Sequence, residues 1–250
     1  MEELRTSNVH LIKGDCLEVM KNIKDKSIDM ILCDLPYGTT ACKWDTIIPF
    51  ELLWEQYNRI IKDNAAIVLF GNEPFTSRLI CCNLKGFKYR WDWNKKIPSG
   101  MSYAKYRPMQ QTEDISIFTK NGEKTVYNPQ MIKRDIPIKS GGMGNSDSAF
   151  TKTYRPLKKT YEYKNPVTLI EFDKIRKGSL HPTQKPVELL KYLIRTYTND
   201  GDTILDNCMG SGSTGQAVLE VGGDRKFIGI EMNDNYFDIA YNRINGYIYE

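Results

Sequence analysis

The chain has 250 residues, of which 40% are hydrophobic and 26% charged, and its formal net charge is +4. This composition is typical of one large globular domain, or of a domain carrying an insertion, and it excludes a fibrous or wholly disordered chain. The longest strongly apolar run, Ala65–Phe70, has six residues and is too short to cross a bilayer. Because the first residues carry acids and lack an apolar signal segment, we expect a cytoplasmic protein without membrane contact.

Segments with the patterns of strands and helices alternate along most of the chain. Residues 65–70 (AAIVLF) are apolar on both faces, as central strands of a parallel sheet are, and residues 186–197 carry leucines at the spacing of an amphipathic helix. This alternation predicts an α/β fold, with a doubly wound and mostly parallel sheet covered by helices on both faces. The predicted strands cover residues 8–13, 27–33, 65–70, 88–93, 114–119, 202–206 and 226–231, and the predicted helices cover 15–22, 50–62, 74–84, 186–197, 213–221 and 235–244.

Residues 120–180 lack this periodicity and form a predicted irregular insertion. They contain 13 Lys or Arg against 6 Asp or Glu, and the run Ser140–Ser148 has the glycine and small polar residues of a loop. Lysine and arginine neutralise phosphates, so a polyanion such as DNA could bind here. A solvated basic surface explains the charge equally well.

Cysteine and histidine usage argues against a metal centre. The six cysteines are irregularly spaced without a Cys-x-x-Cys pair, and the histidines are only His10 and His181. A zinc site needs clustered ligands, and a histidine-based acyl-transfer triad needs a histidine beside its nucleophile. We therefore expect no metal, and cysteines that are buried and reduced.

A glycine-rich turn, with Gly210, Gly212 and Gly215, lies between a predicted strand and a predicted helix. Such a turn lets the backbone approach a ligand, and the N-terminus of the following helix favours negative charge. Glu231 ends the next predicted strand, where an acid can accept hydrogen bonds from ribose hydroxyls. A P-loop is excluded because its Lys-Ser/Thr pair is absent. The spacing leaves open an adenosine cofactor of some other kind, NAD or FAD, or a structural turn.

The tetrapeptide Asp34-Leu35-Pro36-Tyr37 follows another buried predicted strand. The Asp34 carboxylate and the Leu35 carbonyl could accept the two N–H bonds of an exocyclic nucleobase amine and direct its lone pair outward. Pro36 stiffens the loop without offering an N–H, and Tyr37 supplies an aromatic face for a base. A base inside a duplex must be flipped out to enter such a pocket. A plain Pro-Tyr turn is the alternative, but ligands of open parallel sheets bind beyond the carboxyl ends of the strands, where both motifs lie.

Together these motifs resemble those of the DNA amino-methyltransferases, which methylate the exocyclic amine of adenine or cytosine with S-adenosylmethionine. The string His181–Leu190 (HPTQKPVELL) is similar to the family's segment before its cofactor-binding half. The motif order, with the tetrapeptide first and the glycine turn last, resembles the circularly permuted β class. The resemblance implies a Rossmann-like methyltransferase fold, a single catalytic domain over residues 1–250, and an inserted target-recognition region over residues 120–180.

The activity implied by the resemblance is methyl transfer to the 6-amino group of a flipped adenine in double-stranded DNA. An acid rather than Ser before Pro-Tyr favours adenine, while a cytosine 4-amino methyltransferase and, from another class, an NAD-dependent oxidoreductase remain alternatives. Two departures from the family pattern stand out. Leu35 stands where the family has Pro, and Asn207-Cys208 stands where it has Pro-Phe.

The predicted site residues fall into three groups. The predicted catalytic residues are Asp34, Leu35, Pro36 and Tyr37. The resemblance implies cofactor contacts by Asp15, Asp34, His181, Thr183, Lys185, Asp206, Cys208, Gly210, Ser211, Gly212, Ser213, Thr214 and Glu231. The predicted DNA contacts are Lys95, Lys96 and Arg107, which flank a predicted loop, and Tyr154, Arg155, Lys158 and Lys159, which interleave cations and aromatics in the insertion. The β-class resemblance also implies a homodimer, and we find no nuclease motif in the chain.

Overall fold

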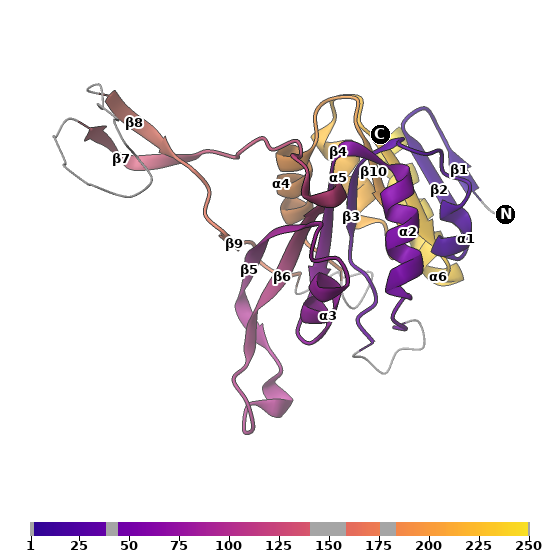
Figure 1. Cartoon of the computed structure of the whole chain (residues 1–250), viewed down its shortest axis with the longest axis horizontal. Helices are drawn as coiled ribbons and strands as arrows, with labels where there is room; N and C mark the ends of the chain where they lie inside the picture. Colours follow the sequence, from indigo (N-terminus) through magenta and orange to yellow (C-terminus); the bar gives the residue numbers. More distant parts are fainter. Residues whose placement is uncertain (1–2, 39–44, 141–158, 176–183, 250) are drawn as a thin grey trace. The chain divides into compact units, whose positions relative to one another are not determined.

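The computed structural model describes residues 3–38, 45–140, 159–175 and 184–249 (Figure 1). Its main element is a nine-stranded sheet in which strands from both ends of the chain are interleaved, in the order β1-β2-β11-β10-β3-β4-β6-β5-β9. The strands are β1 (Glu3–Arg5), β2 (Val9–Lys13), β3 (Ile28–Cys33), β4 (Ile61–Gly71), β5 (Phe87–Ser99), β6 (Gln110–Thr119), β9 (Leu169–Glu171), β10 (Thr203–Asp206) and β11 (Lys226–Glu231).

Five adjacent strands, β2, β11, β10, β3 and β4, run parallel, and β6 and β1 pair antiparallel at either side of them. The six helices of the described residues lie between or after these strands. They are α1 (Cys16–Met20), α2 (Phe50–Ile60), α3 (Phe75–Cys82), α4 (Val187–Tyr197), α5 (Ser213–Val221) and α6 (Asp234–Tyr249). The predicted doubly wound, mostly parallel sheet is confirmed.

Two apolar cores flank the sheet because successive side chains of its strands point to opposite faces. On β3, Met30 and Leu32 belong to one core, and Ile31 and Cys33 belong to the other. The first core is closed by buried side chains of α4, α5 and α6, and the second by those of α1, α2 and α3. Burial on both faces explains why the central strands are apolar throughout.

Residues 129–167 form a second compact unit, separate from the unit made by residues 1–128 and 168–250. It contains the antiparallel pair β7 (Ile132–Ser140) and β8 (Lys159–Lys164). These strands and β9 lie in the segment where the apolar pattern predicted no regular element. Several apolar side chains of the hairpin are exposed, so strand pairing rather than burial defines these elements.

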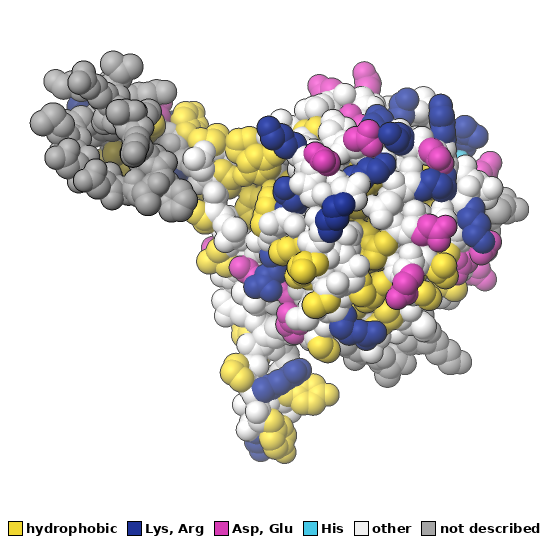
Figure 2. All heavy atoms as spheres, viewed as in Figure 1, with side chains coloured by type: hydrophobic (Ala, Val, Ile, Leu, Met, Phe, Trp, Pro, Cys, Tyr) yellow, Lys and Arg dark blue, Asp and Glu magenta, His cyan; other side chains and the backbone are white. Residues whose placement is uncertain are grey.

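On the face of the first unit seen in Figure 2, Lys and Arg side chains are interspersed with Asp and Glu. None of the described helices is long and apolar enough to cross a membrane. The prediction of buried cysteines is wrong for Cys81 and Cys82, which are exposed at the end of α3, whereas Cys16 and Cys33 are buried. Among the described residues, no group of His, Cys, Asp or Glu is arranged to hold a metal ion.

Candidate active site

A cavity of about 1040 Å³ opens at the carboxyl ends of the parallel strands. This volume is at the upper end of the range for small-molecule sites, so the cavity has room for a nucleoside cofactor and a nucleobase together. The loops that follow β2, β3, β4, β10 and β11 all contribute to its wall. The lining residues include Asp15, Asp34, Leu35, Pro36, Tyr37, Asn72, Asp206, Cys208, Gly210, Ser211, Ser213, Thr214 and Glu231. The structure thus brings the tetrapeptide and the glycine turn to one site.

The Asp34 carboxylate is held by two donors. Its Oδ1 accepts a hydrogen bond from the Tyr37 hydroxyl at 2.6 Å, and its Oδ2 accepts one from Lys185 Nζ at 2.5 Å. Burial raises the pKa of Asp34 above its ordinary value, although the positive charge of Lys185 opposes this effect. Asp34 is therefore a fixed, partly desolvated acceptor, with 22% of its side chain exposed toward the cavity.

Lys185 is buried and also binds Glu113, whose Oε1 lies 2.9 Å from Lys185 Nζ. Burial alone would lower the pKa of Lys185, but its attraction to Asp34 and Glu113 prevails and raises it. The centre of the Phe70 ring lies 4.9 Å from Nζ, so the aromatic face also contacts this cation. The structure shows the Lys185 ammonium bound to the carboxylates of Asp34 and Glu113. Its predicted contact with a cofactor is not tested by these ion pairs and stays a prediction.

Glu113, on β6, is a site residue that sequence reasoning missed. Its Oε2 lies 3.6 Å from Lys95 Nζ, and its Oε1 also accepts a 3.3 Å hydrogen bond from the Tyr37 hydroxyl. The only sequence indication is an acid immediately before an apolar strand. Lys95 is buried and lines the cavity, and burial lowers its pKa. A phosphate contact at Lys95 stays a prediction, and it would require a phosphate that enters the cavity.

The glycine turn is held by two carboxylates. Glu231 accepts the backbone N–H of Gly210 at 2.9 Å and that of Asn233 at 2.8 Å. Burial raises the pKa of Glu231, and these amides oppose the rise. At the start of the turn, burial raises the pKa of Asp206 to about 7, although the Thr214 hydroxyl donates to its Oδ2 at 2.6 Å.

The turn also fits a nucleoside cofactor. Gly210 and Gly212 adopt positive φ angles of 53° and 76°, which glycine reaches without steric cost. A Cβ at Gly212 would lie 3.0 Å from the Ala240 Cβ, so the turn and α6 are in close contact. The Glu231 carboxylate has about four acceptor directions, so ribose hydroxyls can bind to it beside the backbone amides.

Several predicted residues lie elsewhere or are not described. Asp15 lines the cavity, and its carboxylate also caps α1 by accepting the backbone N–H groups of Leu17 and Glu18. Lys96 is half-exposed and lies 3.3 Å from an oxygen of Asp173. His181, Thr183, Tyr154, Arg155 and Lys158 lie outside the described residues, and the backbone of Lys159 begins β8 in the second unit.

Comparison with known proteins relates the chain to DNA methyltransferases. The family model described as DNA methylase, which covers N-6 and N-4 methyltransferases, matches residues 28–242. The DNA adenine methyltransferase YhdJ of Escherichia coli (strain K12) is 29% identical over 252 residues, covering 94% of this chain and 82% of that protein. The type II methyltransferase M.HpaI of Haemophilus parainfluenzae is 27% identical, with coverages of 94% and 74%.

Solved structures share the fold. The PvuII DNA methyltransferase (cytosine-N4-specific) has a TM-score of 0.67 at 16% identity, covering 97% of this chain and 92% of that one. The M1.HpyAVI complex with SAM has a TM-score of 0.61 at 24% identity, covering 95% and 99%. The sheet therefore has the Rossmann-like methyltransferase fold. Because the family match spans most of the sequence, the chain belongs to the DNA methylase family of N-6 and N-4 methyltransferases, whose methyl donor is S-adenosylmethionine.

Proposed function

We propose that this protein transfers the methyl group of S-adenosylmethionine to the exocyclic 6-amino group of an adenine flipped out of double-stranded DNA. The observation that carries the proposal is that the Asp34 carboxylate and the Glu231-held glycine turn line one cavity. The acid that precedes Pro36-Tyr37 favours adenine, and the relative YhdJ is by its name an adenine methyltransferase.

The glycine turn would hold the cofactor. Glu231 is placed to accept from ribose hydroxyls, and the backbone around Gly210 and Ser211 lines the same wall. S-adenosylmethionine, when bound, supplies a methyl group already activated by its positive sulfur. The protein therefore needs no metal and no covalent intermediate, and its main task is positioning, which can lower a barrier by several kcal/mol.

Asp34 would act on the amine. Each carboxylate oxygen has a second acceptor direction, so Asp34 can accept an amine N–H while it keeps Tyr37 and Lys185. The Lys185 charge stabilises the ionised form that this acceptor role needs. As positive charge develops on the nitrogen, it lies beside this carboxylate. The raised pKa of Asp34 makes it a better final acceptor for the amine proton than a fully solvated aspartate.

Tyr37 would hold the base by stacking. Its ring packs against Phe75 with centroids 4.9 Å apart, and its hydroxyl is fixed on Asp34. A base stacked on an aromatic ring gains about 1–3 kcal/mol. Removing the hydroxyl and removing the ring should therefore have separable effects.

The second unit, residues 129–167, would form the core of the target-recognition region. It carries 8 Lys or Arg against 3 Asp or Glu, which favours a DNA backbone. A two-stranded ribbon such as β7–β8 is also of a size that the major groove admits.

The test is to identify the methylated base. Purified protein, S-adenosylmethionine and unmethylated plasmid DNA would be incubated, and the DNA would be digested to nucleosides for mass spectrometry. We expect N6-methyldeoxyadenosine, and its absence from a reaction with Asp34→Ala. N4-methyldeoxycytidine would overturn the adenine assignment, and the absence of any methylated nucleoside would overturn the proposal.

A further inference from the structure

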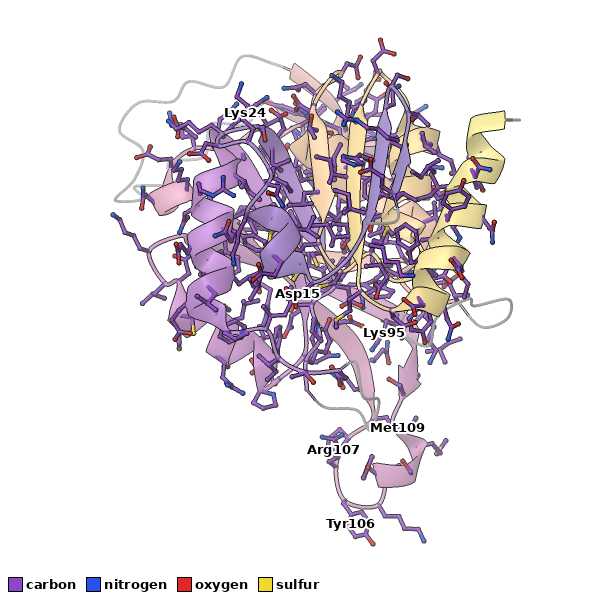
Figure 3. All side chains as sticks on the ribbon, turned by 90° about the vertical axis from the view of Figure 1, so that its right-hand side faces the viewer. Asp15, Lys24, Lys95, Tyr106, Arg107 and Met109 are labelled. Atoms are coloured by element: carbon purple, nitrogen blue, oxygen red, sulfur yellow. The ribbon has the colours of Figure 1, made fainter. Side chains whose placement is uncertain are left out.

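The hairpin formed by β5 and β6 extends beyond the edge of the sheet at which the cavity opens. Pairing between β4 and β6 ends at Gly71 and Asp114, whereas β5 and β6 continue to the pair Ser99 and Gln110. Residues 100–109 form the tip, which Figure 3 shows at the far end of this projection, with Tyr106 pointing away from the body. We call residues 100–109 the hairpin tip.

The stem of the hairpin is part of the active site. Trp93, Lys95, Ser99 and Glu113 all line the cavity, so the tip begins one residue after a cavity-lining side chain. The stem is also tied to the end of β4, because Gln110 Nε2 donates to the Asn72 side chain at 2.5 Å.

The backbone of the tip forms hydrogen-bonded turns. Its N–H groups at Tyr103, Tyr106 and Arg107 donate to carbonyls of Gly100 and Tyr103 at 2.8–3.1 Å. The Arg107 guanidinium lies 5.1 Å from the centre of the Tyr103 ring. In contrast, Tyr106 is 86% exposed, and Met101 is 74% exposed. The turns therefore present large apolar side chains directly to solvent.

The charge of the hairpin complements a polyanion. The hairpin tip contains two cations, Lys105 and Arg107, and no acid. On the face seen in Figure 2, the projecting tip shows hydrophobic and basic side chains but no acidic ones, unlike the mixed charges of the main body.

We propose that the hairpin tip inserts into duplex DNA beside the flipped nucleotide, with Tyr106 stacking on a base exposed by flipping and Lys105 and Arg107 contacting phosphates. Flipping leaves unstacked neighbouring bases, and proteins that open base steps insert apolar side chains into them. The inference rests on the proposed function, because only a base that leaves the duplex reaches Asp34.

The experiment compares Tyr106→Ala and Tyr106→Trp with the control Leu84→Ala. Leu84 is 69% exposed and follows α3, away from the cavity. Single-turnover transfer of tritiated methyl groups to unmethylated duplex plasmid would be measured, together with thermal unfolding and calorimetric binding of S-adenosylmethionine. We expect Tyr106→Ala to slow transfer by about 5- to 150-fold, because this factor corresponds to the loss of one base stacked on an aromatic ring. Tyr106→Trp and Leu84→Ala should stay within about twofold of wild type, and cofactor binding and unfolding temperature should be unchanged in all three.

The outcomes separate the two proposals. If wild type methylates adenine and Tyr106→Ala does so equally fast, the inference about the hairpin tip is overturned and the proposed function stands. If Tyr106→Ala also loses cofactor affinity or thermal stability, a structural role replaces the stacking role. If wild type methylates no DNA, both proposals fall.

Discussion

Replacing Lys185 by Met tests the charged cluster around Asp34. Lys185 Nζ is the cation shared by Asp34 and Glu113, at 2.5 and 2.9 Å, and its side chain is almost fully buried. Methionine fills a similar volume without the charge. The variant therefore leaves two carboxylates facing one space, and among the described residues Lys95 remains 3.6 Å from Glu113.

Removing one partner of a buried ion pair costs about 3–5 kcal/mol. Since Asp34 is partly exposed, we expect a loss of about 3 kcal/mol in the free energy of unfolding at pH 8. Without Lys185, the pKa of Asp34 rises further. A raised folded pKa contributes stability at low pH that is lost as pH rises through that pKa, so the variant should be least impaired near pH 5. For the same reason, the acidic limb of the methyl-transfer rate should move to higher pH.

Urea unfolding at pH 5 and pH 8 measures the effect on the free energy of unfolding. The pH profile of single-turnover transfer measures the shift of the acidic limb of the rate. Lys21→Met is the matched control, because Lys21 forms an exposed pair with Glu18 that is worth about 0.2–1 kcal/mol. If Lys185→Met lost less than 1 kcal/mol at pH 8, or the same amount at both pH values, the assigned role of this cation would be wrong.

Two further predictions concern the cofactor half. Burial raises the pKa of Asp206 in the folded protein to about 7. The free energy of unfolding that this carboxyl group contributes when protonated is therefore lost between pH 5 and pH 8, a decrease of about 3 kcal/mol. Asparagine does not titrate, so from pH 5 to pH 8 the free energy of unfolding of Asp206→Asn, measured with urea, should rise by that amount relative to wild type. If the free energies of unfolding of the two proteins changed in parallel with pH, the burial argument would be contradicted. Glu231→Gln should weaken binding of S-adenosylmethionine by about 10- to 100-fold in calorimetry, since it removes a charged acceptor. Unchanged affinity would show that Glu231 only holds the backbone amides of Gly210 and Asn233.

The sheet could be predicted because its signals are local. Residues 65–70 are apolar on both faces, and this pattern alone identifies a central strand. The meeting of the tetrapeptide with the glycine turn also followed from the sequence, since both come directly after parallel strands. The glycine spacing alone left NAD open, and only the second motif favoured methyl transfer.

The charged cluster and the hairpin tip could not be predicted in the same way. Lys185 and Asp34 are 151 residues apart, so no local pattern identifies them as partners. In the sequence, Glu113 resembles a surface acid. Only the folded sheet places its carboxylate beside Lys185. Strands β5 and β6 extend beyond the predicted residues 88–93 and 114–119, because their added residues are mostly polar and lack apolar periodicity.

The most direct test of the account combines two measurements on Asp34→Ala, with Asp238→Ala on the exposed side of α6 as control. Calorimetry would give the affinity for S-adenosylmethionine, and single-turnover transfer to unmethylated plasmid would give the rate. Asp34→Ala should bind the cofactor nearly as wild type does and should lose at least about 100-fold in rate, while Asp238→Ala should keep both. Normal transfer by Asp34→Ala would contradict the claim that this carboxylate holds the amine opposite the methyl donor.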